Sequence, residues 1–214
     1  MSDARRRILD RLRANRPRSV QPPSAYEKTL NWDKKQRVAA FSERMRAVRG
    51  EVHQLARDEW PTWLANTLPE RGLRRGLIGT SPLATRFATA ADDRLQLTRF
   101  TQPIEAWKTG LFRDIEFSLT GARCGLAESG SLVLWPDAHE PRLMSLVPPL
   151  HIAVLEADRL FENFAAMIAD EKWAEQAMPT NALLISGPSK TADIEQTLAY
   201  GIHGPKQLIT LLID

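Results

Sequence analysis

Residues 183–195 read LLISGPSKTADIE, an aliphatic run followed by a turn that is crowded with hydroxyl groups and carries one ammonium group. Its candidate ligand-binding residues are Ser186, Gly187, Ser189, Lys190 and Thr191. Hydroxyls, free backbone N–H groups and an ammonium group can together bind a phosphate or a carboxylate. The turn is not a Walker A loop, because the spacing Gly-x-x-x-x-Gly-Lys-Ser/Thr is absent. Thr191 as the cap of a helix over about 191–200 would also explain it, so an anion site and an ordinary strand-to-helix corner both stay open.

Glu128 lies between glycines and hydroxyls in a second stretch, GLAESGS at 125–131. Glycines let a ligand approach the main chain closely, so Glu128 could act there as a general base, a nucleophile or a hydrogen-bond acceptor. A bulge or tight connection between two strands, with Glu128 in solvent, is the alternative interpretation. The other candidate ligand-binding residues of this stretch are Gly125, Ser129, Gly130 and Ser131.

Arg142 and His151 begin and end a third stretch, RLMSLVPPLH, which joins two expected strands. The Arg142 guanidinium is suited to clamp a carboxylate or a phosphate. His151 at a strand edge could bind a ligand, as could His203 and Gly204 in the turn GIHGP, but a structural role would also explain each of them. The four histidines show no metal-ligand spacing and no cysteine accompanies them, so we expect no metal site.

The composition indicates a globular chain with one main core. Its 214 residues, 43% of them hydrophobic, can bury one sizeable core but hardly two full domains. The single cysteine excludes an intramolecular disulfide, and this chain alone cannot ligate an iron–sulfur cluster or a thiolate zinc site. No apolar run approaches the roughly 20 residues that span a bilayer, and the charged N-terminus lacks the apolar stretch of a signal peptide. We therefore expect a soluble, cytoplasmic protein.

The basic character of the chain is concentrated at its N-terminus. The first 18 residues hold seven arginines and two aspartates, a charge of +5, whereas the whole chain carries +3. A basic tail on a nearly neutral body is a weak sign of nucleic-acid binding, because no basic stripe interleaved with aromatic residues follows it. A solvated helix face is the simpler interpretation, so a nucleic-acid partner is not expected.

The chain divides into an N-terminal appendage, residues 1–30, and one α/β domain, residues 31–214. The appendage comprises an amphipathic helix over 2–14 and a proline-rich linker over 17–25. The helix is too short to be stable alone, so it should dock on this chain, a second copy or another subunit. In the domain we expect helices over 33–48 and 61–68, and strands over 52–55, 76–79, 95–100, 115–120 and 132–135.

The last third of the chain predicts the fold class. Strands are expected over 151–155, 182–185 and 207–213, with helices over 158–169 and 191–200 between them. Alternating strands and helices with continuous aliphatic strands indicate a mostly parallel sheet in a three-layer α/β/α arrangement. Ligands of such sheets bind at the carboxyl ends of the strands, where the three polar stretches should meet.

Taken together, the three stretches resemble the LUD domain family, of the lactate-utilisation protein C type. They read GLAESGSLVL at 125–134, RLMSLVPPLHIAVL at 142–155 and SGPSKTADIEQTLAYGIHGPKQLITLLID at 186–214. The family typically shows G-I-A-E-T-G-T, then an arginine followed by Leu-Pro-Pro-His-Ile, then S-G-P-S-K/R-T-A-D-I-E and G-V-H-G-P. This sequence departs from the pattern at Ser129 and Ser131, where threonine is usual, and at Leu126, where isoleucine is usual.

The resemblance implies a fold akin to the phosphosugar-isomerase and CoA-transferase group and a role in bacterial oxidation of lactate to pyruvate. It also implies two partner proteins of iron–sulfur type, which would carry the clusters, while this chain would hold no cofactor. For the 186–191 turn the resemblance favours a site for a small carboxylate or a phosphate-bearing ligand.

Three functions stay open from the sequence. The first is an accessory component of a lactate-oxidising complex, with a pocket formed by Glu128, Ser129, Arg142, His151, Lys190 and His203. The second is a free-standing enzyme of transferase or isomerase type that uses Glu128 as nucleophile or base. The third is a regulatory module that binds nucleic acid through the basic N-terminal helix.

Overall fold

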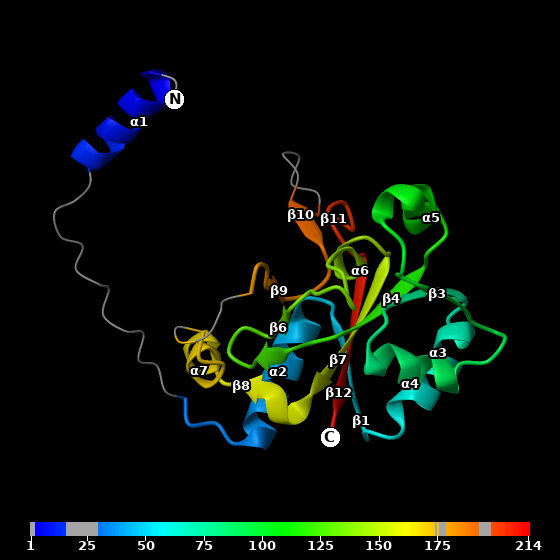
Figure 1. The fold of residues 1–214 in the computed structure, drawn as a ribbon. Coiled ribbons are helices and arrows are strands. Elements are labelled where there is room, and N and C mark those ends of the chain that lie inside the picture. The colour runs from blue at the N-terminus through cyan, green and yellow to red at the C-terminus, as the bar shows by residue number, and fades with distance from the viewer. Residues whose placement is uncertain (1–2, 16–29, 174, 176–178, 193–197) are drawn as a thin grey trace.

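A six-stranded parallel sheet forms the centre of the molecule (Figure 1). The computed structural model describes residues 3–15, 30–173, 175, 179–192 and 198–214. Every neighbouring pair of strands in this sheet is parallel, as the aliphatic runs predict. In spatial order the strands are β1 (Glu51–Leu55), β12 (Gln207–Ile213), β7 (Leu150–Glu156), β4 (Phe117–Gly121), β2 (Arg75–Ile78) and β3 (Gln96–Arg99).

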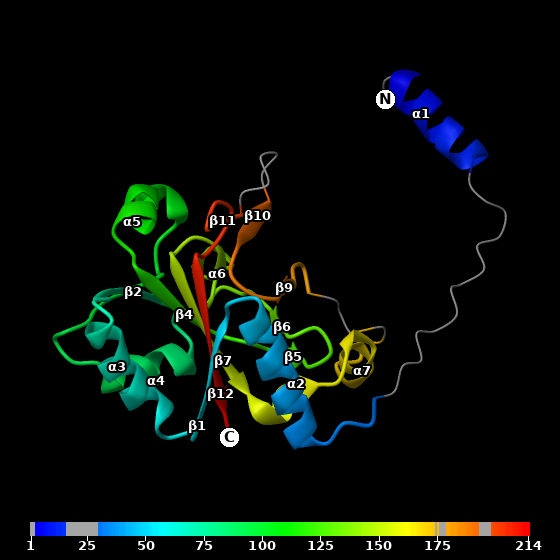
Figure 2. The same ribbon diagram turned by 180° about the vertical axis from the view of Figure 1, so that it is seen from behind.

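Helices cover both faces of this sheet, so the predicted α/β class is confirmed. On one face, α3 (Trp60–Glu70) and α4 (Pro82–Ala90) pack on a core that includes Ile152 and Ile209. On the other face, α2 (Lys34–Ala47) contributes Phe41 and Met45 to a second core with Leu155 and Leu212. Figures 1 and 2 show α3 and α4 on one side of the sheet and α2 on the other. Three shorter helical segments are η1 (Ile104–Ala106), α5 (Lys108–Arg113) and α6 (Leu143–Leu146).

A smaller four-stranded sheet lies beside α2. Its strands, in order, are β8 (Leu160–Phe161), β5 (Cys124–Leu126), β6 (Ser131–Leu134) and β9 (Leu183–Ile185). The predicted strand over 182–185 therefore exists as β9, but its placement in the parallel sheet is wrong, because β9 pairs antiparallel with β6. The GLAESGS stretch forms the connection of the antiparallel hairpin β5–β6.

The predicted helix over 158–169 is replaced by three short elements. A 3-10 turn, η2 (Ala157–Arg159), precedes β8, and α7 (Phe164–Asp170) begins only after Asn163. The Asn163 side chain accepts a hydrogen bond from the backbone N–H of Ala166, 2.9 Å away, and so caps the helix at that point. Pairing of β8 with β5 holds Leu160 and Phe161 extended.

The predicted helix over 191–200 is also wrong. β10 (Lys190–Ala192) pairs antiparallel with β11 (Leu198–Tyr200), and residues 193–197 lie outside the described part of the chain. Backbone hydrogen bonds across the base of this hairpin replace helical ones: the N–H of Gly201 donates to the Ser189 carbonyl at 3.0 Å. The turn at 186–189 therefore leads into a strand, not into the N-terminus of a helix.

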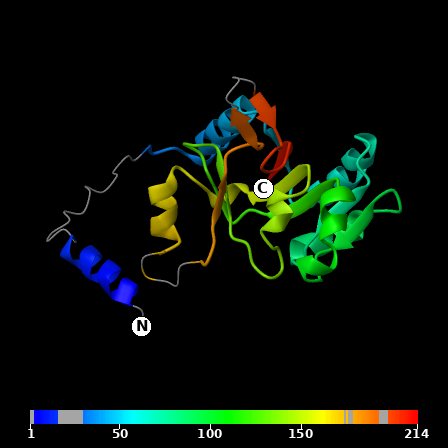
Figure 3. The ribbon, with the colours of Figure 1, turned by 90° about the horizontal axis from the view of Figure 1, so that it is seen from above.

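The N-terminal helix, α1 (Asp3–Ala14), forms where the sequence predicts it and has no buried residue. Its apolar residues Ile8 and Leu12 are 61% and 64% exposed. In all three views α1 lies apart from the two sheets (Figures 1–3). Among the described residues, no helix is both long and apolar enough to cross a membrane.

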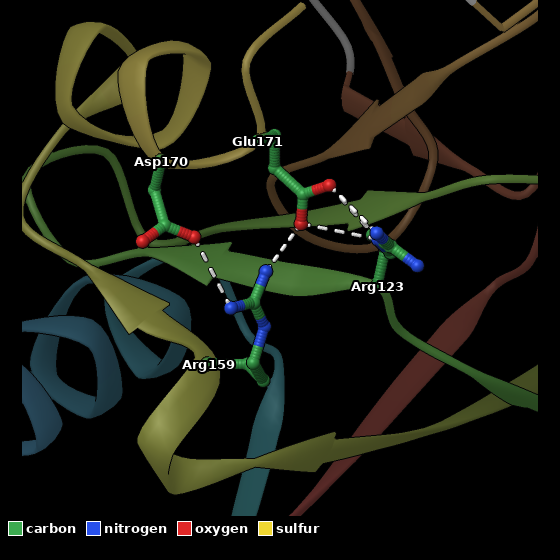
Figure 4. A network of polar contacts seen from close by, with 4 residues as sticks. All are labelled: Arg123, Arg159, Asp170 and Glu171. Carbon is green, nitrogen blue, oxygen red and sulfur yellow. Dashed lines mark hydrogen bonds and ion pairs between the residues drawn. The ribbon is translucent and has the colours of Figure 1, made fainter. Parts of the chain in front are cut away.

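Figure 4 shows a charged network that ties α7 to the smaller sheet. The Glu171 side chain, 4% exposed, accepts hydrogen bonds from Arg123, the nearest at 2.7 Å, and from Arg159. Asp170, 51% exposed, makes an ion pair with Arg159 at 3.2 Å. The Arg123 hydrogen bonds hold the pKa of the Glu171 carboxyl below its ordinary value.

Replacing Glu171 should loosen this network. We expect Glu171→Gln to lower the free energy of unfolding by about 1–3 kcal/mol at pH 7, because two guanidinium groups lose a buried acceptor charge. The exposed Asp170→Asn is the control and should cost less than about 1 kcal/mol. Because the Glu171 pKa is lowered in the fold, the difference from wild type should shrink as the pH falls below about 4.5. Urea denaturation at pH 7 and at a pH below about 4.5 measures these differences in the free energy of unfolding. Equal effects of the two substitutions at pH 7 would contradict the structural role of Glu171.

Gly76 in β2 permits close packing of the parallel sheet. A Cβ atom there would lie 2.2 Å from Cζ of Phe117 and 2.9 Å from Cδ2 of Leu97. We expect Gly76→Ala to lower the free energy of unfolding by about 1–3 kcal/mol, because the fully buried Phe117 ring has to move. Gly110→Ala in α5 is the control, since its Cβ would meet only Asp114 at 3.5 Å. Chemical denaturation of both variants measures the difference, and a neutral Gly76→Ala would refute the packing argument.

Candidate functional site

A cavity of about 190 Å³ lies where the polar stretches of the sequence approach the large sheet. Its position corrects the expectation of a site at the carboxyl ends: His151 and Leu208 are each the second residue of their strand, so the cavity lies at the amino ends of β7 and β12. The turn after β9 reaches this end because β9 belongs to the smaller sheet. The lining residues are Ser145, Leu146, His151, Leu184, Ile185, Ser186, Gly187, Ser189, His203, Gly204, Pro205 and Leu208.

Backbone hydrogen bonds hold the turn at 186–189 against the segment that precedes β12. The N–H of Ser189 donates to the carbonyl of Pro205 at 2.9 Å. Gly204 permits the contact, because a Cβ atom there would lie 3.2 Å from Cβ of Ser189. Gly187 has a φ of +136°, and its Cβ would lie 2.6 Å from Val48. Both glycines thus shape one wall of the cavity.

A chain of hydroxyl groups connects this turn to the β5–β6 hairpin. Oγ of Ser186 lies 2.6 Å from Oγ of Ser131, which in turn lies 2.7 Å from Oγ of Ser129. Ser131 is 3% exposed, whereas Ser129 is exposed on the hairpin turn. Gly130 takes a φ of +65° in that turn, which favours glycine. The serines of the GLAESGS stretch are therefore connected to the cavity through Ser186.

His151 forms the inner wall. Its side chain is fully buried, and Nε2 lies 2.8 Å from Oγ1 of Thr120 on the neighbouring strand. Nδ1 has no hydrogen-bond partner among the residues that the structure describes. Burial lowers the pKa of His151 to about 3, so the imidazole is neutral at physiological pH.

The structure leaves the charged residues of the predicted site outside the cavity wall. Arg142 is exposed at the start of α6, and Lys190 is exposed on β10. Glu128 is half-buried in the hairpin turn, where its N–H donates to the carbonyl of Glu162 at 2.8 Å. Gly125 serves packing, since a Cβ atom there would lie 2.7 Å from both Leu155 and Leu160. The predicted residues that do not line the cavity are Gly125, Glu128, Ser129, Gly130, Ser131, Arg142, Lys190 and Thr191.

Three notable polar residues carry no signal in the sequence: Thr120, Ser145 and Glu140. Ser145 lines the cavity and also a much smaller one of about 10 Å³, which Thr120 and Glu140 share. The Glu140 carboxylate accepts hydrogen bonds from Oγ of Ser81 at 2.5 Å and from the N–H of Gly121 at 2.7 Å. Burial raises the Glu140 pKa above its ordinary value. Such positions depend on tertiary contacts, not on spacing.

The cavity is suited to hydrogen-bonded recognition of a small molecule. Its volume is below the roughly 300–1,000 Å³ of pockets for drug-sized ligands. Its wall offers three serine hydroxyls and two imidazoles, and none of its lining residues carries a carboxylate, ammonium or guanidinium group. Cys124 is buried elsewhere, and burial raises its thiol pKa to about 12, which leaves it protonated. Among the described residues, no group of three or more His, Cys, Asp or Glu side chains could hold a metal ion.

Relatives of this chain span nearly its whole length. An uncharacterized protein of Neisseria meningitidis serogroup B is 36% identical over 98% of this chain and 93% of its own length. Lactate utilization protein C 1 of Bacillus mycoides is 24% identical, over 97% of this chain and 94% of its own. Lactate utilization protein C of Halalkalibacterium halodurans is 27% identical, over 84% and 80%.

The fold has a counterpart of known structure. The crystal structure of a DUF162 family protein from Deinococcus radiodurans superposes with a TM-score of 0.62 over 86% of this chain and 99% of that one, at 19% identity. The model of the LUD domain matches residues 38–213, which include both sheets and every lining residue of the cavity. The chain is therefore a member of the LUD domain family.

Proposed function

We propose that this protein is an accessory component of a bacterial lactate-utilisation system and that its cavity binds a small carboxylate. The observation that carries the proposal is the full-length similarity to proteins named lactate utilization protein C. Family membership by itself would not name a pathway, whereas relatives with that name align over four fifths or more of both chains.

The cavity supports a binding role better than a role in covalent catalysis. Its hydroxyls and neutral imidazole can donate hydrogen bonds to the oxygens of a small acid. Glu128, the nucleophile or base of the transferase or isomerase hypothesis, does not line the cavity. For this reason we favour the accessory role over a free-standing transferase or isomerase.

Electron transfer in the proposed system falls to partner proteins of iron–sulfur type. An iron–sulfur cluster is typically held by four cysteine thiolates, and this chain has a single cysteine, which is buried. Co-purification of the full chain from its own host, followed by iron and sulfide analysis of the bound proteins, tests this part. Partners without clusters would refute it.

Growth on lactate tests the pathway. Deleting the gene in its host should abolish growth on lactate as sole carbon source but not on glucose, and the wild-type gene should restore it. Ser186→Ala and His151→Asn should restore growth poorly, because each removes a polar group from the cavity wall. Arg142→Ala, an exposed site outside that wall, is the control and should complement fully. Normal growth of the deletion strain would remove the pathway assignment.

The neutral state of His151 predicts how stability depends on pH. Its pKa is about 3 in the fold and about 6.5 in an unfolded chain, so between these values the unfolded state binds the extra proton. The free energy of unfolding should therefore fall by up to about 1.4 kcal/mol per pH unit below pH 6.5 on account of this residue. His151→Asn should show a correspondingly shallower pH dependence between pH 7 and 5. Urea denaturation at several pH values measures this. The same dependence of the free energy of unfolding on pH in wild type and variant would contradict the assignment.

A further inference from the structure

The His151 imidazole leaves one nitrogen unsatisfied in the wall of the cavity. Nε2 is paired with Thr120, and Nδ1 has no partner among the residues that the structure describes. A buried polar atom without a partner is costly to folding. A ligand oxygen or donor at Nδ1 would remove that cost, and the adjoining cavity is open to such a ligand.

The hydrogen bond with Thr120 bears on which nitrogen of His151 carries the proton. Thr120 is 3% exposed, and the hydrogen-bond partner that the structure gives its hydroxyl is His151. If the hydroxyl donates to Nε2, the proton lies on Nδ1, and one buried donor is left for a ligand. If Nε2–H donates to the hydroxyl, both the Thr120 O–H and the Nδ1 lone pair are left without partners. The first arrangement leaves fewer buried groups unpaired and is favoured on that ground.

The cavity wall further restricts the class of ligand. A neutral imidazole that carries its proton on Nδ1 is a donor at that nitrogen, so a ligand bound there must offer an acceptor. Ser186 and Ser189 also line the cavity and can donate to a second oxygen. Because no lining residue carries an ammonium or guanidinium group, the site lacks a permanent cation, which suits one negative charge better than the two of a phosphate monoester.

We propose that Thr120 holds His151 as the Nδ1–H tautomer and that this N–H donates to a carboxylate oxygen of a small monocarboxylate. The inference rests on the proposed ligand cavity and deepens it: Thr120 is a positioning residue, and His151 is the buried donor that selects an acceptor.

The first test is the tautomer in the ligand-free protein. NMR of the full chain with ¹⁵N-labelled histidine, at neutral pH, should show protonated Nδ1 and unprotonated Nε2 for His151. The His151→Asn variant assigns the signal. Thr120→Val should convert it to a mixture of tautomers, and Thr120→Ser should restore the single form. A protonated Nε2 in the wild type would overturn the inference, and this readout decides alone if Thr120→Val does not fold.

The second test is ligand titration with acetate, L-lactate, pyruvate and inorganic phosphate. At least one monocarboxylate should shift the His151 Nδ1–H resonance, and phosphate should not compete with it. His151→Asn should bind that acid about 10- to 100-fold more weakly, as loss of a hydrogen bond to a charged group implies. Thr120→Val should weaken binding by a smaller factor, with recovery in Thr120→Ser.

Thr210→Val is the matched control for Thr120→Val. Thr210 is fully buried on β12 and does not line the cavity, and its hydroxyl, unlike that of Thr120, has no partner among the described residues. The same chemical change should leave the affinity unaltered there. Binding without movement of the His151 signal, or no binding of any monocarboxylate at millimolar concentration, would overturn the inference. The growth test and the NMR test can fail separately. Failure to bind a monocarboxylate would not alter the growth defect of the deletion strain on lactate, and normal growth of that strain would not alter a response of the His151 signal to a ligand.

Discussion

Burial of the central strands on both faces is the constraint on which the rest of the structure depends. β7 and β12 lie in the middle of a parallel sheet with a packed core on each side, and residues 150–155 and 208–213 are all buried, so a polar side chain at these positions has no access to bulk water. An imidazole in this place stays neutral and has to be satisfied by its neighbours or by a ligand. The chemistry of the cavity follows from the burial of the strand that carries His151.

The smaller sheet supplies the other half of the site. Its hairpin β5–β6 and its edge strand β9 bring serines from distant parts of the chain within hydrogen-bond distance. Ion pairs of Glu171 with Arg123 and Arg159 attach the end of α7 to this sheet, whereas no residue that lines the cavity carries a carboxylate, ammonium or guanidinium group. Polar recognition and structural ion pairing are thus separated in space.

Much of the large sheet could be predicted from the sequence, because buried parallel strands are continuous aliphatic runs such as 207–213. The family, too, could be predicted from three ordered motifs. What local pattern could not predict was pairing: Leu183–Ile185 fits either sheet, and only contact with β6 decides. The segment after Ser189 has helix-compatible residues, but bonds from Ser189 to Pro205 and Gly201 select a hairpin.

The sequence predicted which segments of the chain approach the cavity, but not which side chains line it. Acidic and basic residues such as Glu128, Arg142 and Lys190 are conspicuous in a sequence. In the folded chain, however, the polar side chains that line the cavity are those of serine and histidine. Thr120 and Glu140 were not foreseen, because a threonine in a strand or a glutamate in a loop becomes special only through partners. In the case of Glu140 those partners are 59 and 19 residues away.

The hydrogen-bonded row Ser129–Ser131–Ser186 can couple ligand binding in the cavity to the surface of the hairpin. Each hydroxyl has one hydrogen to donate. With both hydrogen bonds formed, all donors therefore point either inward, from Ser129 to Ser186, or outward, from Ser186 to Ser129, and reversing one hydrogen bond reverses the other. An acceptor seated at Ser186 requires the inward polarity, from Ser129 through Ser131. The direction of the Ser129 hydroxyl, which faces solvent, therefore depends on whether Ser186 donates a hydrogen bond to a ligand or to Ser131.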